Sequence, residues 1–266
     1  MTERVHFTKA HAYGNDFLYV RSDAVAGRAL DALARELCDR HTGIGADGLI
    51  VYETAGHLPS MRLLNADGSR SEISGNGVRG FAAILCRQDE RNPIEVTIQT
   101  DAGPKRLTRT GRSAGRQLFR AAMGVPRDLR RVALAAAGER LDVAVMDFGN
   151  PQAVVVGELP ALDRFHRLGA ALERHELFPE RTNVEFAAVE APDRVRILIW
   201  ERGVGPTHSS GTGSCAALIA ASAFGGAARQ ADVVAPGGTQ RVEWEDDSVY
   251  LTGWAEILVD GDWLRA

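Results

Sequence analysis

Two short glycine-rich segments carry the residues best suited to chemistry in this chain. Each reads Ser-Gly-X-Gly, from Ser74 to Gly77 and from Ser210 to Gly213, and each directly precedes an alanine-rich stretch. Glycine permits a tight turn and close approach of a ligand, and the first N–H groups of a helix lack intrahelical partners. Together with the helix dipole, such a turn can bind an anion such as a carboxylate. One serine before a helix is usually an ordinary N-cap, but the matched pair favours a ligand site.

The two serine segments belong to a longer internal repeat. Gly14-Asn15 and Gly149-Asn150 each lie between two strand-like apolar runs, at nearly the same offset as Ser74 and Ser210. A repeated offset predicts a duplicated unit with several strands, a glycine-rich turn and one apolar helix. Such a helix is best buried inside a sheet. The predicted fold class is therefore α+β, with two pseudo-symmetric halves, each a mixed or antiparallel sheet rolled around a central helix, and an active-site cleft between them.

Composition excludes several classes of function. The chain has 266 residues, 45% hydrophobic and 25% charged, and a formal net charge of −4, so nothing indicates a nucleic-acid partner. The most basic stretch, Arg106 to Arg131, lacks interleaved aromatic residues, and we predict a solvated face with a linker over about residues 105–131. Residues 1–9 lack the apolar core of a signal peptide, and the apolar stretch Cys215 to Ala227 is too short to span a bilayer and is predicted as a buried helix.

Cofactor sites are not predicted either. The three cysteines, Cys38, Cys86 and Cys215, are too far apart for a disulfide framework or a metal cluster, so a cytoplasmic, metal-free protein is expected. Residues 43–48 match G-x-G-x-x-G, but a helical segment (30–39) precedes them and a strand-like segment (49–52) follows. A dinucleotide site needs the reverse order, so no nucleotide cofactor is expected.

Eight segments, in order and in spacing, resemble the diaminopimelate epimerase family. They are Gly14-Asn-Asp16, Gly43-Ile-Gly-Ala-Asp-Gly48, Asn65-Ala-Asp-Gly-Ser69, Gly75-Asn-Gly77, Gly149-Asn-Pro151, Asn183-Val184, Trp200-Glu-Arg-Gly-Val-Gly205 and Gly211-Thr-Gly213. The resemblance implies cofactor-independent interconversion of LL- and meso-diaminopimelate, a step toward lysine and peptidoglycan precursors. It also implies an N-terminal domain of residues 1–118 plus 255–266 and a C-terminal domain of residues 119–254. Because the family often dimerises, a homodimer is an expectation too.

The resemblance also implies which residues bind the substrate. The side chains expected to line the pocket are Asn15, Asn65, Asn150, Asn183, Glu201 and Arg202. Of these, Asn65, Asn183, Glu201 and Arg202 would recognise the distal ammonium and carboxylate, because a guanidinium grips a carboxylate bidentately. The backbone N–H groups of Gly75, Asn76, Gly211 and Thr212 would hold the carboxylate at the reacting carbon, where charge develops as the α-proton leaves.

The chain departs from the family at the catalytic positions. The family uses two cysteines, one on each face of the α-carbon, and Ser74 and Ser210 stand there instead; Gln152 replaces a usual histidine. Serine is a far weaker acid than a thiol of pKa ~8.5, so it needs a neighbouring base. His208 and His11 are candidate bases, against the alternatives of an exposed loop histidine and a structural turn histidine.

Three explanations of the serine pair stay open. The serines could be engineered, although Gln152 argues against that; they could epimerise as activated hydroxyls; or the site could serve another reaction. The alternative functions are a diverged isomerase, racemase or dehydratase acting on a related amino acid through Ser74 and Ser210, and a catalytically silent amino-acid-binding homologue. The retained distal-end residues favour the epimerase.

Overall fold

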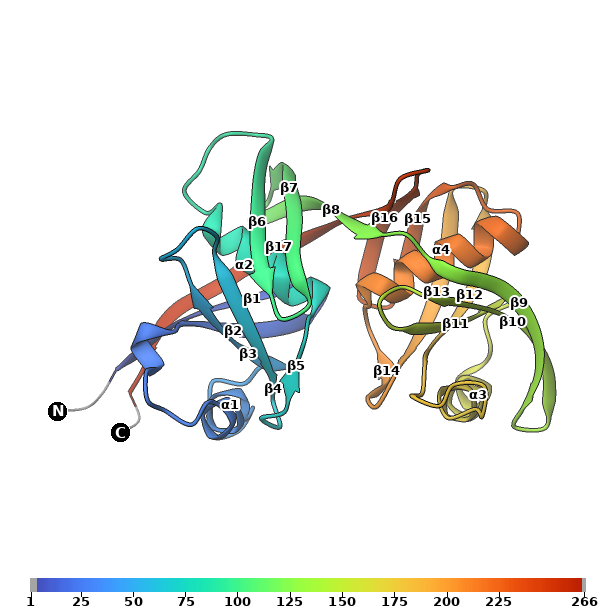
Figure 1. Cartoon of the computed structure of the whole chain (residues 1–266), viewed down its shortest axis with the longest axis horizontal. Coiled ribbons are helices and arrows are strands. Elements are labelled where there is room, and N and C mark those ends of the chain that lie inside the picture. Colours follow the sequence, from blue (N-terminus) through green and yellow to red (C-terminus); the bar gives the residue numbers. More distant parts are fainter. Residues whose placement is uncertain (1–3, 265–266) are drawn as a thin grey trace. The chain divides into compact units, whose positions relative to one another are not determined.

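The computed structural model of the chain describes residues 4–264. The chain divides into two compact units, Met1–Ala121 with Trp254–Ala266, and Ala122–Gly253. Residues 1–3 and 265–266 of the predicted N-terminal domain lie outside the described part. Each unit is described by itself (Figure 1).

The first unit alternates strands with two α-helices and one short 3₁₀ helix. Its elements are β1 (Val5–Ala12), β2 (Asn15–Arg21), η1 (Asp23–Val25), α1 (Leu30–Cys38), β3 (Gly48–Glu53), β4 (Ser60–Asn65), β5 (Arg70–Ser71), α2 (Gly75–Leu85), β6 (Ile94–Thr100), β7 (Gly103–Ser113) and β8 (Arg116–Gly124). The long β17 (Val249–Trp263) returns the chain to this unit and pairs with β1. Since β8 also pairs with β17, the strands close into a ring in the order β17, β1, β2, β3, β4, β6, β7, β8.

The second unit begins with one additional strand and then repeats the order of strands and α-helices of the first. It contains β9 (Arg127–Ala136), β10 (Glu139–Asp147), β11 (Pro151–Val156), α3 (Leu162–Glu173), β12 (Asn183–Ala191), β13 (Arg194–Glu201), β14 (Gly205–Thr207), α4 (Gly211–Phe224), β15 (Gln230–Ala235), β16 (Gly238–Trp244) and the first part of β17. The predicted helices at residues 30–39 and 215–227 correspond to α1 and α4, and the alanine-rich stretch after Gly77 lies in α2.

Strand pairing confirms the internal duplication. Along β1, β2, β3, β4, β6 and β7, neighbours pair antiparallel, parallel, antiparallel, parallel and antiparallel in turn. The strands β10, β11, β12, β13, β15 and β16 repeat this pattern step for step. Each Gly-Asn turn joins two antiparallel strands, β1 to β2 in the first unit and β10 to β11 in the second, as predicted. The α+β class with two rolled sheets is therefore confirmed.

Each unit has two apolar cores, one on each face of its sheet. The inner cores surround α2 and α4, and the outer cores contain α1 and α3. From Gly213 to Ala221 every residue of α4 is buried, which is why its sequence is apolar on all faces. Cys215 belongs to this core, as predicted, with no exposed surface. The two buried helices are rigid supports for the residues at their N-termini.

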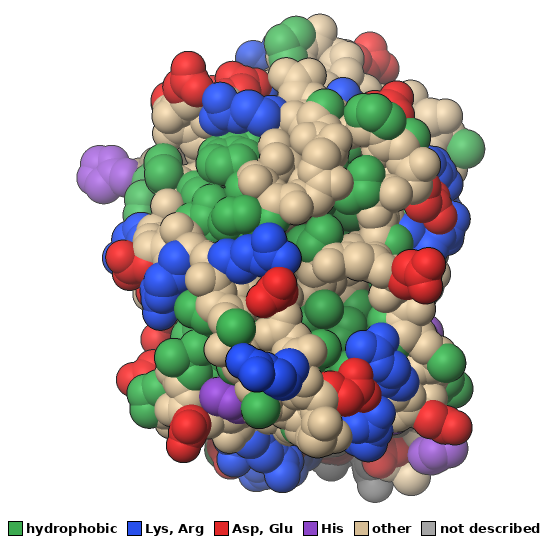
Figure 2. All heavy atoms as spheres, turned by 90° about the vertical axis from the view of Figure 1, so that its right-hand side faces the viewer, with side chains coloured by type: hydrophobic (Ala, Val, Ile, Leu, Met, Phe, Trp, Pro, Cys, Tyr) green, Lys and Arg blue, Asp and Glu red, His purple; other side chains and the backbone are tan. Residues whose placement is uncertain are grey.

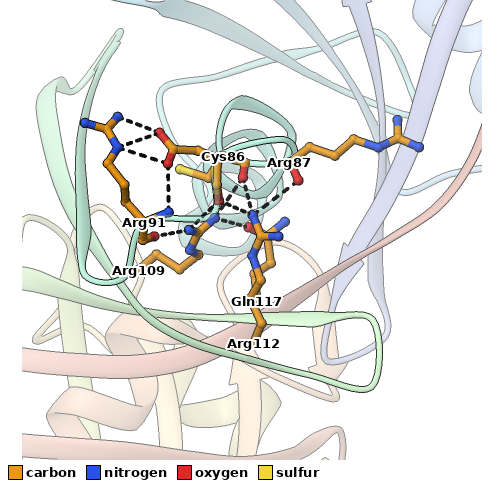
Figure 3. Close-up of polar contacts among 7 residues, drawn as sticks. Cys86, Arg87, Arg91, Arg109, Arg112 and Gln117 are labelled. Carbon is orange, nitrogen blue, oxygen red and sulfur yellow. Dashed lines mark hydrogen bonds and ion pairs between the residues drawn. The ribbon is translucent and has the colours of Figure 1, made fainter.

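The predicted linker region, residues 105–131, contains the boundary between the two units, after Ala121, but it is folded into strands. These residues form most of β7, all of β8 and the start of β9, with inward-facing Leu107 and Phe119. One of their arginines, Arg109, has no exposed surface. Its guanidinium and that of Arg112 are directed at the carbonyl groups that follow α2, as Figure 3 shows. A cation is stabilised there because the C-terminal end of a helix carries partial negative charge.

Charges of both signs are interspersed on the molecular face in Figure 2, in keeping with the mixed charge of the sequence. In the second unit, for example, Glu139 accepts from Arg164 at 2.9 Å and Arg131 donates to Asp142 at 2.8 Å. Exposed pairs of this kind contribute little to stability, about 0–1 kcal/mol each. Within residues 4–264, no helix has the length and apolar character needed to cross a membrane.

Candidate active site

Ser74 and Ser210 are the N-caps of the two buried helices. Ser74 Oγ accepts from the N–H of Gly77 at 3.1 Å, and Ser210 Oγ accepts from the N–H of Gly213 at the same distance. Both serines have extended backbone, which turns the chain into the helix. An oxygen that accepts from a helix N-terminus gains negative charge at lower cost, since the helix dipole favours an anion there. The capping role expected of an ordinary serine and a chemical role are therefore compatible.

The N–H groups predicted to bind a carboxylate lie in the first turn of each helix. Gly75 and Asn76 are the first two residues of α2, and Gly211 and Thr212 are the first two of α4. N–H groups at these positions have no acceptor within the helix. Each unit thus carries the same anion-binding geometry beside its serine.

In the first unit, hydrogen bonds join the Gly-Asn turn to α2. Asn76 Nδ2 donates to Asn15 Oδ1 at 3.3 Å, and Asn15 Nδ2 donates to Asp47 Oδ2 at 2.7 Å. The buried Arg79 donates to Asn76 Oδ1 at 2.7 Å. These bonds fix the amides of two predicted site residues. Asn65, by contrast, donates to Ser69 Oγ at 2.9 Å within its own turn.

In the second unit, three predicted site residues meet at one end of β11 and β12. Asn183 Oδ1 accepts from the N–H of Arg202 at 3.0 Å, and Asn183 Nδ2 donates to the Pro151 carbonyl at 3.3 Å. Gln152 Nε2 donates to Asn150 Oδ1 at 2.7 Å, and Gln152 is paired with Asn183 across the two strands. Gln152 therefore lies inside this network rather than beside it.

Glu173 positions the turn that carries Glu201 and Arg202. This carboxyl, on α3 and only 3% exposed, accepts from Trp200 Nε1 and from the N–H of Gly203, each at 2.9 Å. Burial alone would raise the pKa of Glu173, but these two hydrogen bonds, together with the positive charges of Arg174 and Arg181, outweigh it and lower the pKa. The ionised carboxylate therefore holds both ends of the turn. No feature of the sequence indicates this role, because Glu173 lies at the end of an ordinary amphipathic helix.

The two histidines proposed as bases, His11 and His208, differ in their contacts and exposure. His11 Nδ1 accepts from the N–H of Gly14 at 3.2 Å, and His11 Nε2 lies 3.6 Å from Glu256 Oε2, so this residue is engaged in its turn. The side chain of His208 is exposed, while its carbonyl accepts from the N–H of Gly237. These contacts agree with a structural turn position for His11 and an exposed loop position for His208, and the role of either as a base stays a prediction.

A buried carboxyl that the sequence analysis did not single out lies under the N-terminus of α4. Glu185, on β12, has no exposed surface. Burial raises its pKa well above the ordinary value of 4.5, and the negative charge of Glu201 raises it further. The available signal was a lone acidic residue in the run from Val184 to Ala188, which is otherwise apolar.

The raised pKa of Glu185 predicts a pH-dependent stability. The folded state keeps this proton longer than the unfolded state, so raising the pH above about 4.5 favours unfolding. Relative to Glu185→Gln, the wild-type free energy of unfolding should fall by ~1.4 kcal/mol per pH unit until the folded carboxyl ionises. Urea titrations of both proteins between pH 5 and 8 measure the difference. Two curves that stay parallel would show that Glu185 is already ionised in the folded state.

Comparison with known proteins finds relatives over nearly the whole chain. The profile of the family described as diaminopimelate epimerase matches residues 7–127 and 144–258. The chain belongs to the diaminopimelate epimerase family. It is 39% identical over 290 residues to the diaminopimelate epimerase of Desulforudis audaxviator, covering 98% of this chain and 100% of that one. The diaminopimelate epimerase of Bacteroides thetaiotaomicron is 36% identical, with 98% and 99% covered.

Solved structures share the fold of this diaminopimelate epimerase family member at low identity. A predicted epimerase from Pseudomonas aeruginosa has a TM-score of 0.75 at 15% identity, over 98% of this chain and all of that one. A probable proline racemase from Agrobacterium radiobacter has a TM-score of 0.72 at 17% identity, over 97% and 92%. Both serine turns fall inside the residues that the family profile matches.

Proposed function

We propose that this chain interconverts LL- and meso-diaminopimelate without a cofactor, with Ser74 and Ser210 as the two proton-transfer groups. Family membership supports the reaction, since relatives over nearly the whole chain are named diaminopimelate epimerases. The observation that carries the proposal is the matched pair of serines, each capping a buried helix with the same 3.1 Å bond. Two-base chemistry at one carbon needs such a pair.

The proposal assigns the carboxylate at the reacting carbon to the helix N-termini. Removing the α-proton moves negative charge onto that carboxylate, and N–H groups aimed at it stabilise the charge as it develops. Gly75 and Asn76 in α2, and Gly211 and Thr212 in α4, are suited to this because their N–H groups have no intrahelical acceptor. Donors fixed by a buried helix need no rearrangement during the reaction.

We assign recognition of the distal end to the turn that Glu173 holds. Glu201 would bind the distal ammonium, and Arg202 would bind the distal carboxylate. The side-chain amides of Asn183 and Asn65 would also bind this end of the substrate. Support comes from the bond between Asn183 Oδ1 and the N–H of Arg202, which ties the two residues at 3.0 Å. Asn15 and Asn150, from the two Gly-Asn turns, complete the proposed set.

The weak acidity of the two serine hydroxyls determines the expected rate of epimerisation. Each hydroxyl gains some acidity from the N–H it accepts, but it stays a far weaker acid than a thiol, so slow turnover is expected. We further expect a cytoplasmic homodimer that serves lysine and peptidoglycan precursor synthesis.

Incubation with LL-diaminopimelate, followed by separation of stereoisomers, tests the function. The meso isomer should accumulate with the wild-type protein and should not with Ser74→Ala or Ser210→Ala, which remove one proton carrier each. Release of ammonia or a keto acid would indicate that the chain is a lyase and not an epimerase. Saturable binding without conversion would instead indicate an amino-acid-binding homologue.

A further inference from the structure

The two serine turns are backed by different side chains. A methyl group built on Gly77 would lie 2.9 Å from Cδ1 of Ile50, whereas one built on Gly213 would lie 2.5 Å from Oε1 of Glu185. Ile50 and Glu185 occupy equivalent strands, β3 and β12, in the repeat. The space under Ser74 is therefore apolar, and the equivalent space under Ser210 holds a carboxyl group.

The asymmetry extends to a second position. In the first unit Phe17 pairs with Gly48 across β2 and β3, and in the second unit Gln152 pairs with Asn183 across β11 and β12. Gln152 is completely buried, like Glu185, and its amide faces both carboxyl oxygens at 3.2 Å. A buried polar pair in place of two apolar residues is costly unless its hydrogen bonds are satisfied.

Two hydrogen-bond arrangements can satisfy this pair, and one proton separates them. As the structure stands, the Gln152 oxygen faces the carboxyl, and its nitrogen donates to Asn150 Oδ1 at 2.7 Å and lies 3.2 Å from Asn183 Nδ2. Oxygen facing oxygen is attractive only if Glu185 carries a proton and donates it. With an ionised Glu185, the amide must turn over to donate to the carboxylate at 3.2 Å, and its oxygen would then accept from Asn183 Nδ2 at 3.2 Å and lie 2.7 Å from Asn150 Oδ1. Asn150 would have to turn over as well.

We propose that Glu185 is a positioning residue that carries a proton at neutral pH and, through Gln152, holds Asn150 as a donor for a substrate carboxylate. Glu185 O–H donates to Gln152 Oε1, Gln152 Nε2 donates to Asn150 Oδ1, and Asn150 Nδ2 is thereby left to donate to the ligand. Loss of the proton reverses both amides and presents the oxygen of Asn150, which repels a carboxylate. The ligand role of Asn150 rests on the proposed function; the proton on Glu185 does not.

The surroundings of Glu185 favour the neutral form. The charged group that acts on it is Glu201, from β13, and this charge opposes ionisation. The groups that the structure places against its carboxyl are uncharged: Gln152 from β11 and Gly213 from the first turn of α4. Because the methyl position of Gly213 lies 2.5 Å from Glu185 Oε1, a larger residue at this position would displace the carboxyl. Burial itself also raises the pKa of Glu185.

Spectroscopy of the ligand-free chain tests the proton and its coupling. Infrared difference spectra of wild type minus Glu185→Gln should contain the carbonyl band of a protonated carboxylic acid at pH 7. The side-chain amide signal of Asn150, assigned with Asn150→Asp, should shift with pH in the wild type and stay fixed in Glu185→Gln. A carboxylate band at pH 7, or an Asn150 titration that persists in Glu185→Gln, would overturn the proposal.

Diaminopimelate binding then tests the consequence for the ligand. Affinity should fall about 10-fold across the pH range in which the infrared band disappears, in line with loss of a hydrogen bond to a charged group, and it should not fall with Glu185→Gln. An equal fall in both proteins would contradict the assigned role of Asn150. A wild-type chain that binds no diaminopimelate at any pH would refute the proposed function, while the infrared and amide signals would still decide the state of Glu185.

Discussion

Replacing both Ser74 and Ser210 with cysteine should raise the rate of α-proton exchange by about 10³-fold or more. A thiol has a pKa of ~8.5, several units below that of a serine hydroxyl, and each unit of mismatch is worth ~1.4 kcal/mol in the proton-transfer barrier. The N–H groups of Gly77 and Gly213, which now bond the hydroxyls at 3.1 Å, would stabilise the two thiolates in the same positions. Exchange of the α-hydrogen of LL-diaminopimelate measured by NMR gives the rate.

Single cysteine variants are the matched controls for this gain. Each should accelerate exchange less than the double variant, because reaction in either direction uses both groups. A double cysteine variant no faster than wild type, with an unchanged melting temperature, would show that the site is built for different chemistry. A gain confined to one position would show that only one serine acts on the α-proton.

Replacing Arg109 with methionine should destabilise the first unit by about 4 kcal/mol. The guanidinium, which has no exposed surface, donates to the carbonyls of Cys86 and Asp89 at 2.7 Å, to Gln117 Oε1 at 3.2 Å and to the Arg91 carbonyl. Hydrogen bonds to a charged group contribute ~1.5–3 kcal/mol each, and the stranded carbonyls add a desolvation cost. Urea unfolding of the variant measures the loss.

Arg112→Met is the control for this loss. Arg112 donates to the same Cys86 carbonyl but is exposed, so water can replace its bonds and the expected loss is under about 1 kcal/mol. Equal losses in the two variants would mean that burial of Arg109 contributes nothing to its bonds. Arg109→Lys should recover only part of the loss, because an ammonium cannot reach several carbonyls with the planar fork of a guanidinium.

The parts of the fold that could be predicted are those with local signals. The Gly-Asn turns at residues 14–15 and 149–150 mark the two hairpins, and serine before glycine marks the start of α2 and α4. Because α4 is apolar on all faces, it must be buried at the centre of its unit, and a sheet around it could therefore be predicted as well. The similar offset of these landmarks predicted the duplication without any long-range information.

The parts that could not be predicted depend on long-range pairing. Strands β7 and β8 contain enough arginine to resemble a solvated linker, and only their partners in the sheet bury Leu107, Arg109 and Phe119. Strand propensity depends strongly on such context. The return of β17 to pair with β1, some 250 residues earlier in the chain, likewise has no local signal.

The candidate site also contains residues that could be predicted from the sequence and residues that could not. The resemblance named the residues at the helix N-termini and in the turns, and the structure joins Asn15 to Asn76 and Asn183 to Arg202. The residues that hold them were missed. Glu173 and Glu185 act through neighbours that are distant in the sequence, and a single acidic residue in a helix or a strand does not reveal what it bonds.

Deuterium incorporation from D₂O is the most direct measurement of the central claim that the two capping serines move a proton at the α-carbon. Wild-type protein incubated with LL-diaminopimelate in D₂O should place one deuterium at the α-carbon of each meso molecule formed, and Ser74→Ala and Ser210→Ala should each stop that conversion. Meso product that retains only hydrogen at this carbon, or conversion that persists in both alanine variants, would contradict it.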